Sequence, residues 1–392
     1  MANVSSSNGL EKYPKLRFKG FSEPWNAIRF GDIVDEYSDR TKEENEDILL
    51  SAAIEGMFLN SELFDHQRGA SNKGYKKIDM GTLVLSTQNL HLGNANVNLR
   101  FEHGMVSPAY KTYHIHDCSI GLIAEWVKSE KAKRFFYDAT TVGASVCRRN
   151  VEWDTLYDQS LYLPSEAEQE RLATFLTALT TRIKKQTELV EHLKKYKRGV
   201  SIAIFDRKIS LTKNSPSWIK TTVGEICKIT MGQSPDSESY NTDQIGIPLV
   251  QGNADMKNRI TCPQRYTSKP TKICEKGSII LSVRAPVGSV GRADRTVCLG
   301  RGVCAINSDN NDFLYYFFER NEPYWKRIEQ GGTFTAISGD DIADMPIDYP
   351  SLEERQKIAD FLLKIDTHIA AEQNTLDQFI TLKSGLLQQL FT

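Results

Sequence analysis

The chain contains a long internal repeat, and this repeat constrains the fold more than any other feature. Residues 163–183 align without gaps, at an offset of 186 positions, with residues 349–369. The match extends to residues 199–205, which align with 385–391. A repeat of this length predicts two similar halves within one chain, related by an approximate two-fold symmetry.

Each copy of the repeat predicts a long helix with a sharp start. Ser165 and Glu168, like Ser351 and Glu354, have the spacing of a capping box, in which a serine oxygen and a glutamate carboxylate satisfy backbone amides reciprocally. Apolar residues then recur at alternating spacings of four and three, which is a heptad seam. The helix seam that we define here includes Leu176, Ile183, Gln186, Val190, Leu362, Ile369, Glu372 and Leu376.

The two helices are expected to pair with each other. A helix of about 40 residues is roughly 60 Å long, which is too long to be buried in one ordinary domain. Both copies place polar residues at the same two seam positions, Gln186 and Glu372 at one and Lys197 and Lys383 at the other. Because a globular segment separates the helices, the simplest arrangement is an antiparallel coiled coil. Two amphipathic helices, each packed on its own domain, are the alternative.

The segments before the helices resemble one another more weakly. Trp25 and Gly31 have the spacing of Trp218 and Gly224, and the β-branched segments 81–86 and 277–282 both read as strands. The expected fold class is α+β, with two globular α/β domains separated by two long antiparallel coiled-coil helices and internal pseudo-two-fold symmetry. The expected boundaries are a flexible tail at 1–13, a first domain at 14–164, a helix at 165–205, a linker at 206–217, a second domain at 218–350 and a helix at 351–392.

Composition narrows the class of protein. Hydrophobic residues make up 40% and charged residues 25% of the chain, which excludes collagen-like, disordered and membrane classes for the whole chain. No apolar stretch approaches the roughly 18 residues of a spanning helix, and the first ten residues do not resemble a signal peptide, so we expect a cytoplasmic protein. Seven cysteines without C-x-x-C spacing are expected to be reduced.

Signatures of catalysis are missing from the sequence. It contains no phosphate-binding loop of the G-x-x-x-x-G-K-[ST] type, no dinucleotide fingerprint, no nucleophile elbow and no H-E-x-x-H. Residues 114–118 hold two histidines, an aspartate and a cysteine, but no second cluster completes a metal site. We therefore expect no catalytic residue, no metal and no cofactor.

Basic residues gather in one part of the second half. Residues 256–301 hold ten of them against Glu275 and Asp294, a local charge of +8 in a chain whose net charge is −1. Such a cluster is often only a solvated surface. Interleaved with Gly, Ser and Thr in turn-rich sequence, it also suits contact with phosphates.

The repeated segments carry a family resemblance. PSEAEQERLATFL and PSLEERQKIADFL, each followed by a heptad helix that ends in KRG or KSG, resemble the DNA-specificity (S) subunit of type I restriction-modification enzymes. The segments PKLRFKGFSEPW at 14–25, GSIILSVRAPVGSVG at 277–291 and GGTFTAISGDDI at 331–342 are similar to that family as well. The duplicated arrangement is more specific than any single motif.

The resemblance implies a function. Each globular domain would be a target-recognition domain that reads one half of a split, asymmetric site on double-stranded DNA. The helices would act as spacer and as docking site for two methyltransferase subunits, with restriction-translocase subunits in the larger complex and no membrane. The family subunit has no catalytic centre, so the methyl donor S-adenosylmethionine would bind the partner methyltransferase.

Candidate base readers follow from the chemistry of the loops. Arginine pairs with guanine, and Asn or Gln pairs with adenine, through forked donors and acceptors in the major groove. The first half has Thr87-Gln88-Asn89-Leu90-His91 where the second has an Arg284 loop. We expect DNA contacts from Lys73, Lys76, Gln88, Asn89, His91, Arg148 and Arg149 in the first domain, and from Gln233, Ser234, Arg259, Arg284, Arg292 and Thr335 in the second. About half of these would only contact phosphate.

Two other classes of function stay open at this level. One is a coiled-coil scaffold with two protein-binding globules, which salt-sensitive binding to duplex DNA would separate from a DNA reader. The other is a self-contained DNA methyltransferase or nuclease, which the missing methyl-donor loop opposes.

Overall fold

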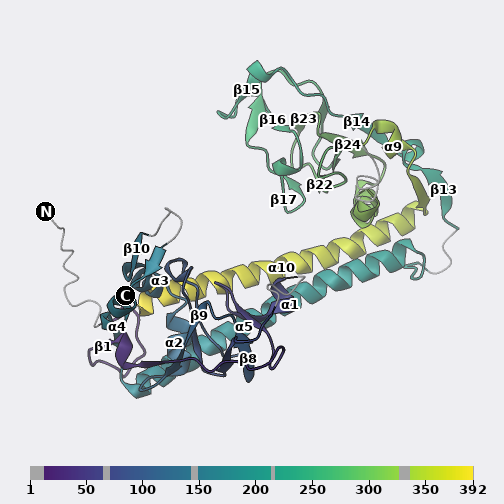
Figure 1. Ribbon diagram of the computed structural model, residues 1–392. Helices are drawn as coiled ribbons and strands as arrows, with labels where there is room; N and C mark the ends of the chain where they lie inside the picture. The colour runs from purple at the N-terminus through teal and green to yellow at the C-terminus, as the bar shows by residue number, and fades with distance from the viewer. Residues whose placement is uncertain (1–12, 65–70, 143–148, 213–216, 326–335, 392) are drawn as a thin grey trace. The chain divides into compact units, whose positions relative to one another are not determined.

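The fold was analysed in a computed structural model, which describes residues 13–64, 71–142, 149–212, 217–325 and 336–391. The chain divides into two compact units. Unit 1 comprises residues up to 187 together with those from 374 onward, and unit 2 comprises residues 188–373. Two long helices, α5 (Glu166–Phe205) and α10 (Leu352–Leu390), each contribute to both units (Figure 1).

Unit 1 is built around an antiparallel four-stranded sheet with the strand order β2-β9-β6-β7. Short two-stranded sheets and helices surround it. Its strands are β1 (Asn26–Arg29), β2 (Val34–Tyr37), β3 (Leu50–Ala52), β4 (Met57–Leu59), β5 (Lys76–Asp79), β6 (Leu83–Ser86), β7 (Ala95–Val97), β8 (His103–Val106), β9 (Tyr110–Ile115), β10 (Thr140–Val142), β11 (Arg149–Val151) and β12 (Ser160–Leu163), and its short helices are α1 (Asn60–Leu63), α2 (Ile120–Trp126), α3 (Glu130–Asp138) and α4 (Trp153–Asp158).

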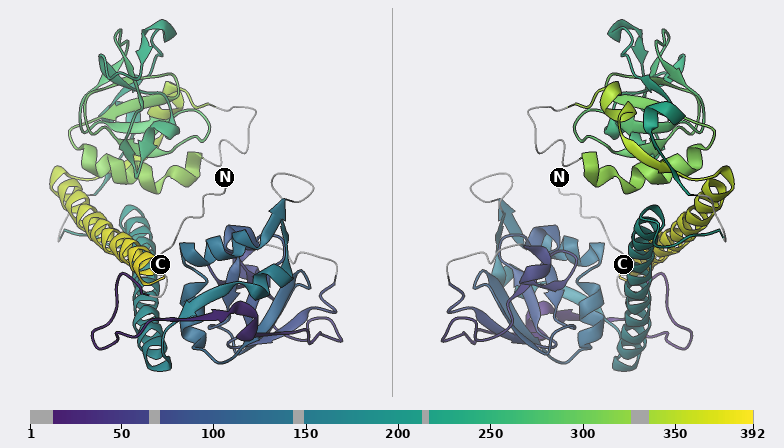
Figure 2. Two further views of the ribbon diagram at one scale, coloured as in Figure 1. Left: turned by 90° about the vertical axis from the view of Figure 1, so that its left-hand side faces the viewer. Right: turned by 90° about the vertical axis from the view of Figure 1, so that its right-hand side faces the viewer.

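Unit 2 contains a six-stranded sheet, β14-β24-β21-β22-β18-β17, and a five-stranded sheet, β15-β19-β16-β23-β20. Its strands are β13 (Ile219–Thr222), β14 (Lys228–Met231), β15 (Tyr240–Asn241), β16 (Ile247–Val250), β17 (Met256–Lys257), β18 (Ile260–Thr261), β19 (Arg265–Thr267), β20 (Ile273–Cys274), β21 (Ile279–Ser282), β22 (Val290–Arg292), β23 (Val297–Leu299), β24 (Val303–Asn307) and β25 (Pro346–Tyr349), and its short helices are α6 (Val223–Ile226), α7 (Asn311–Arg320) and α9 (Gly339–Ala343). Both views of Figure 2 show α7 below the sheets of this unit.

The two units repeat the same strand plan. The four strands β14-β24-β21-β22 have the order and antiparallel pairing of β2-β9-β6-β7. The strand before each long helix pairs with the first strand of its unit in the same register, because Asn26 faces Leu163 as Ile219 faces Tyr349. The predicted strands at 81–86 and 277–282 are confirmed as β6 and β21. Duplication therefore extends beyond the helices into the sheets.

The matched glycines Gly31 and Gly224 are explained by close packing. A Cβ on Gly31 would lie 3.0 Å from the Cβ of Tyr157 in α4, and one on Gly224 would lie 2.9 Å from the Cβ of Ala343 in α9. Both distances are shorter than ordinary contacts between side-chain carbons. A glycine at this position lets the turn after the first strand pack against the short helix that precedes the last strand.

The helix seam is the buried face of both long helices. Leu176, Val190 and Leu362 are almost fully buried, Leu376 and Gln186 are buried, and Ile183, Ile369 and Glu372 are half-buried. In unit 1, Arg182 of α5 stacks on Phe379 of α10, and Lys383 hydrogen-bonds Thr180, so residue numbers rise along one helix as they fall along the other. The predicted antiparallel arrangement is confirmed within unit 1, and a contact from Lys197 to Asp366 repeats it within unit 2.

The capping-box prediction is only partly correct. Ser351 accepts a hydrogen bond from the amide of Glu354 at 3.3 Å, as the motif predicts. The carboxylate of Glu168, however, is fully buried and binds the Arg17 guanidinium through two 2.7 Å hydrogen bonds. Glu354 likewise accepts from the indole of Trp218 at 3.0 Å. These glutamates anchor the segment that leads into each domain, a long-range role that a local motif does not reveal.

The same backbone contact joins each domain to a helix end. In unit 2 the amide of Ile209 donates to the carbonyl of Ala203 at 3.2 Å, just after α5 ends. In unit 1 the amide of Leu16 donates to the carbonyl of Gln389, near the end of α10, at 3.3 Å. By the two repeat offsets, Leu16 corresponds to Ile209 and Gln389 to Ala203. The start of the described chain therefore docks on α10 as the linker docks on α5.

Each unit buries its own core. In unit 1, Leu172 and Leu176 of α5 and Leu387 of α10 pack with the apolar residues of the globular domain, including Trp126 and Phe136. In unit 2 the aromatic helix α7 packs on Ile358 and Leu362 of α10 and on Ile204 of α5. The predicted fold class, two globular α/β domains with two long helices, is confirmed. Within the described ranges, no helix is long and apolar enough to cross a membrane.

Candidate nucleic-acid interface

Four loops of unit 2 meet around a polar cavity of about 260 Å³. They follow strands β14, β16, β21 and β23, so the strands fix where the loops converge. The lining residues are Ser234, Gln251, Gly252, Asn253, Arg284, Ala285, Arg301 and Gly302. Two guanidinium groups and two carboxamides in one recess form the donor and acceptor set that reads base edges.

Glycine allows these loops to pack backbone to backbone. A Cβ on Gly302 would lie 2.1 Å from the carbonyl oxygen of Gln251, and one on Gly232 would lie 2.1 Å from that of Gly300. No side chain fits at such distances. The Gly-rich sequence thus serves to bring the polar residues of neighbouring loops together.

Intramolecular contacts orient the lining. The Arg301 guanidinium and backbone amide both donate to the Ser234 hydroxyl, at 3.4 and 3.2 Å. The Gln251 carboxamide accepts from Arg265 at 3.3 Å and donates to the hydroxyl of Tyr240 at 3.4 Å. Arg284 is exposed, and its guanidinium forms no ion pair with any described residue. Arg284 and Arg301 therefore keep donors available for a ligand.

The basic segment of residues 256–301 presents most of its charge to solvent. Eight of its ten basic residues are exposed: Lys257, Arg265, Lys269, Lys272, Lys276, Arg284, Arg295 and Arg301. A surface of this kind suits the phosphates of a duplex, which supply much of the affinity of any DNA-binding protein.

The other two basic residues of the segment, Arg259 and Arg292, form ion pairs inside the domain instead of facing solvent. Arg259 forms two hydrogen bonds to Glu322, at 2.5 and 3.0 Å. Burial lowers the pKa of its guanidinium, but the hydrogen bond to Glu322 and the charge of Glu319 more than offset this and leave the pKa above its ordinary value. Arg292 pairs with Asp312 and stacks 4.1 Å from the ring of Tyr315. Both guanidinium groups are engaged in intramolecular ion pairs, so Arg259 and Arg292 are not among the residues that we propose to contact bases.

The remaining second-domain candidates are placed as follows. Ser234 lines the cavity, and Gln233 beside it is exposed, with its backbone amide donating to Leu299 at 2.9 Å. Thr335 lies outside the described residues.

In unit 1 the loop after β6 and the β10–β11 hairpin form a second group of candidates. Gln88 and Asn89 are exposed at the loop. Burial, and then the charge of Arg149, lower the pKa of His91, which places the imidazole near that guanidinium. Arg149 stacks 4.1 Å from Tyr137 and donates to the hydroxyl of Thr140 at 2.6 Å. Neutral His91, two carboxamides and one stacked arginine offer donors and acceptors of the same kinds as the cavity of unit 2.

The lysines predicted in unit 1 behave differently. Lys73 is exposed in the turn before β5. Lys76 begins β5 and is 5% exposed, and burial lowers the pKa of its ammonium group. Little of the Lys76 side chain is available to a ligand, so Lys76 is the weakest of the predicted DNA contacts in unit 1. Arg148 lies outside the described residues.

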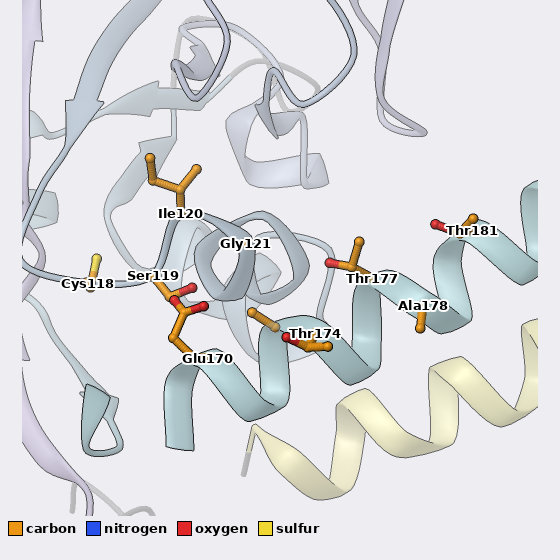
Figure 3. A pocket seen from close by; sticks show the side chains of 10 residues that line it. Cys118, Ser119, Ile120, Gly121, Glu170, Thr174, Thr177, Ala178 and Thr181 are labelled. Atoms are coloured by element: carbon orange, nitrogen blue, oxygen red, sulfur yellow. The ribbon is translucent and has the colours of Figure 1, made fainter. Parts of the chain in front are cut away.

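A larger groove of about 870 Å³ lies between the start of α2 and the first turns of α5 (Figure 3). Ile120, Glu170 and Thr177 are among its ten lining residues, none of which is basic. A phosphate backbone therefore finds no counter-charge there, and the groove is not part of the candidate interface. No group of three metal-ligating side chains occurs among the described residues, and His114 stacks on Tyr37 at 4.0 Å.

Sequence reasoning missed several residues of the cavity. Gln251 and Asn253 were not selected, although both lie within three residues of the end of strand β16. Arg301 was only counted in the basic segment. A carboxamide at the end of a buried strand is a usable signal, but the convergence of four loops depends on the fold.

Comparison with known proteins agrees with this geometry. Residues 216–381 match the family described as type I restriction modification DNA specificity domain. A relative from Methanocaldococcus jannaschii, named as specificity subunit of the type I restriction enzyme MjaX, is 33% identical over 248 residues. Residues 216–381 are therefore similar to a type I DNA-specificity domain. The match to this relative covers 59% of the chain and 58% of the relative, and the chain spans about half the length of the curated relatives it matches.

Two solved structures share the fold. The S subunit of a type I restriction-modification system from M. genitalium matches with a TM-score of 0.63 at 15% identity, covering 97% of this chain and 99% of that one. A chain from a study of complex assembly and conformational transition of the type I R-M system matches with a TM-score of 0.60 at 23% identity, covering 94% and 97%. The type I specificity fold thus extends over nearly the whole chain.

Proposed function

We propose that this chain is the DNA sequence-specificity subunit of a type I restriction-modification system. Residues 14–164 and 218–350 would be the two target-recognition domains, each reading one half of a bipartite asymmetric site. The observation that carries the proposal is the cavity of unit 2, where Arg284 and Arg301 present donors beside Gln251 and Asn253. The duplicated sheet supplies a reason for a bipartite target, because equivalent domains read equivalent lengths of DNA.

The chain acts in this proposal without catalysis of its own. S-Adenosylmethionine and the methyl-transfer site belong to two methyltransferase subunits, and restriction-translocase subunits complete a cytoplasmic complex. The long helices offer an apolar surface for these partners, since Tyr196 and Leu382 are 55% and 52% exposed. These two residues are equivalent by the repeat offset, as two identical partners require.

Replacing either Tyr196 or Leu382 with serine should release one methyltransferase copy from the complex, which mass photometry would measure.

The direct test is reconstitution with the cognate modification subunit. We expect the purified chain alone to methylate no DNA. Mixed with the modification subunit, it should direct methylation to a single bipartite motif, which methylome sequencing would detect. Site-specific methylation by the modification subunit alone, with the same motif, would contradict the proposal. Exchange of residues 218–349 for those of a relative should change one half-site only.

A further inference from the structure

A lysine of the helix seam joins three elements in unit 2. Lys197 of α5 lies 2.7 Å from a carboxylate oxygen of Glu319 in α7 and 2.7 Å from one of Asp366 in α10. Its side chain is only 12% exposed. The hydroxyl of Tyr316 donates a hydrogen bond to the Asp366 carboxylate at 2.9 Å. Glu319 also forms an ion pair with Arg259, at 3.3 Å. We call Lys197, Glu319 and Asp366 the seam lock of unit 2.

Unit 1 contains the same arrangement at the equivalent positions. Lys383 of α10 lies 2.6 Å from a carboxylate oxygen of Glu125 in α2 and donates to the hydroxyl of Thr180 in α5 at 2.6 Å. Thr180 in turn donates to Glu125 at 2.6 Å. Lys383, Glu125 and Thr180 form the seam lock of unit 1. In both units a lysine from one long helix reaches the other long helix and the recognition domain.

The two locks require one and the same helix register. Thr180 and Lys197 lie seventeen positions apart in α5, and Asp366 and Lys383 lie seventeen positions apart in α10. A slip of three or four residues keeps apolar residues near the seam and would move each ammonium about 4.5–6 Å along the axis. Both locks would then break together, although the apolar seam would still tolerate the new register.

The chemistry indicates specificity rather than added stability. Removing a lysine and a carboxylate from water is costly, and an apolar side chain at the same seam position would contribute at least as much to stability. A buried polar residue in a coiled coil instead selects one register and one partner arrangement. Lys197 and Lys383 occupy positions of this type.

We propose that Lys197 and Lys383 are positioning residues that fix the register of α5 against α10 and the seat of each recognition domain on the helices. Resting on the proposed function, this register sets the number of base pairs between the two half-sites. In unit 2 the contact from Glu319 to Arg259 extends the lock to the β17–β18 turn. Arg259 therefore contributes to the seam lock of unit 2 through its ion pair with Glu319.

The test replaces each lysine with methionine and maps the methylated motif of the reconstituted complex. We expect K197M and K383M to keep both half-sites but to accept gaps one base pair longer or shorter, with at least a tenfold loss of discrimination. K194M is the matched control, since Lys194 is an exposed lysine of α5 that pairs only locally with Glu191. A single, unchanged gap length in both variants would overturn the proposal.

Two further variants guard against misfolding. K383M leaves Glu125 buried without its cation, so K383M/E125Q removes both charges and should fold while showing the same relaxed gap. K197R keeps a cation that can reach Glu319 and should restore a single gap. A single gap in K383M/E125Q, or relaxed gaps in K197R, would count against the lock.

Hydrogen exchange of the full chain without DNA separates this inference from the proposed function. Amides of α7 should exchange at least tenfold faster in K197M, and those of α2 in K383M, than in K194M. Unchanged exchange would overturn the lock whatever the DNA result. A wild-type chain that directs no site-specific methylation would instead overturn the proposed function and leave the exchange result standing.

Discussion

Single arginines in the basic segment have opposite roles that depend on where acidic residues lie. Arg259 and Arg292 each meet a carboxylate from α7 or from the residues just after it, whereas Arg284 and Arg301 meet none among the described residues. These carboxylates lie 20 to 63 positions away in sequence, so no local pattern could assign the roles. At this scale, burial and ion pairing decide which side chain keeps its donors available for a ligand.

The free arginines should determine the second half-site. We expect R284A or R301A to weaken binding to the cognate duplex by about 1–3 kcal/mol, roughly 5- to 150-fold, and to relax one or two positions of that half-site. The first half-site should not change. Competition binding at fixed salt and methylome mapping measure both effects, with R295A as control because Arg295 pairs with Asp294 at 2.7 Å. Equal losses in R295A would argue for a general charge effect.

Lys128 should make the unfolding free energy of unit 1 depend on pH in the alkaline range. Burial is the main cause that lowers the pKa of this lysine to about 8, while its ammonium donates to the carbonyls of Ile54 and Ala95 at 2.8 and 3.0 Å. The unfolded lysine has a pKa near 10.5, so the unfolded chain binds more protons between pH 8 and 10.5. The unfolding free energy of wild type relative to K128M should therefore rise over that range, by up to about 3 kcal/mol. If denaturant titrations gave wild type and K128M the same change of unfolding free energy with pH, this role of Lys128 would be excluded.

Helices and strands follow from sequence to different degrees. The seam was predictable because its burial obeys a period that the sequence displays, and β6 and β21 because a β-branched run between glycines has few alternatives. The sheet order of unit 2 was not predictable, since it depends on pairings such as β14 with β24 and β16 with β23, which lie far apart in the chain. The candidate cavity depends on that order, which explains why Gln251 and Asn253 were overlooked.

Glycines in different elements should respond oppositely to alanine. G224A puts a Cβ 2.9 Å from Ala343 and is expected to destabilise unit 2 by about 1–3 kcal/mol. G199A lies inside α5 with open space around it and should stabilise by about 0.5–1 kcal/mol. Chemical unfolding of the two variants beside wild type checks both signs. Loss of stability in G199A as well would show that the helix needs its glycine for another reason.

At the scale of the whole molecule, the helices should act as a ruler. A four-residue insertion after Gln186 adds about 6 Å to α5 and turns the apolar stripe by only about 40°. Because each seam lock joins α5 to α10, the insertion must be matched by one after Glu372, the equivalent position in α10, if both locks are to form.

The matched double insertion should give unchanged half-sites separated by one or two more base pairs, since duplex DNA advances about 34 Å in 10 base pairs. The single insertion should lose discrimination between gap lengths. Methylome sequencing of both variants is the measurement. The original gap in a stable, active double variant would rule out the ruler.

The backbone contact between Leu16 and Gln389 has a consequence for how such a chain can evolve. Because it repeats the contact between Ile209 and Ala203, the fold treats the junction between the two ends of the described chain as it treats the linker in the middle. The segment that leads into each globular domain therefore meets the end of a long helix through the same backbone contact. Recombination that exchanges one domain together with its leading segment would conserve this contact, so we expect the exchanged domain to dock on the helix end as the original one does.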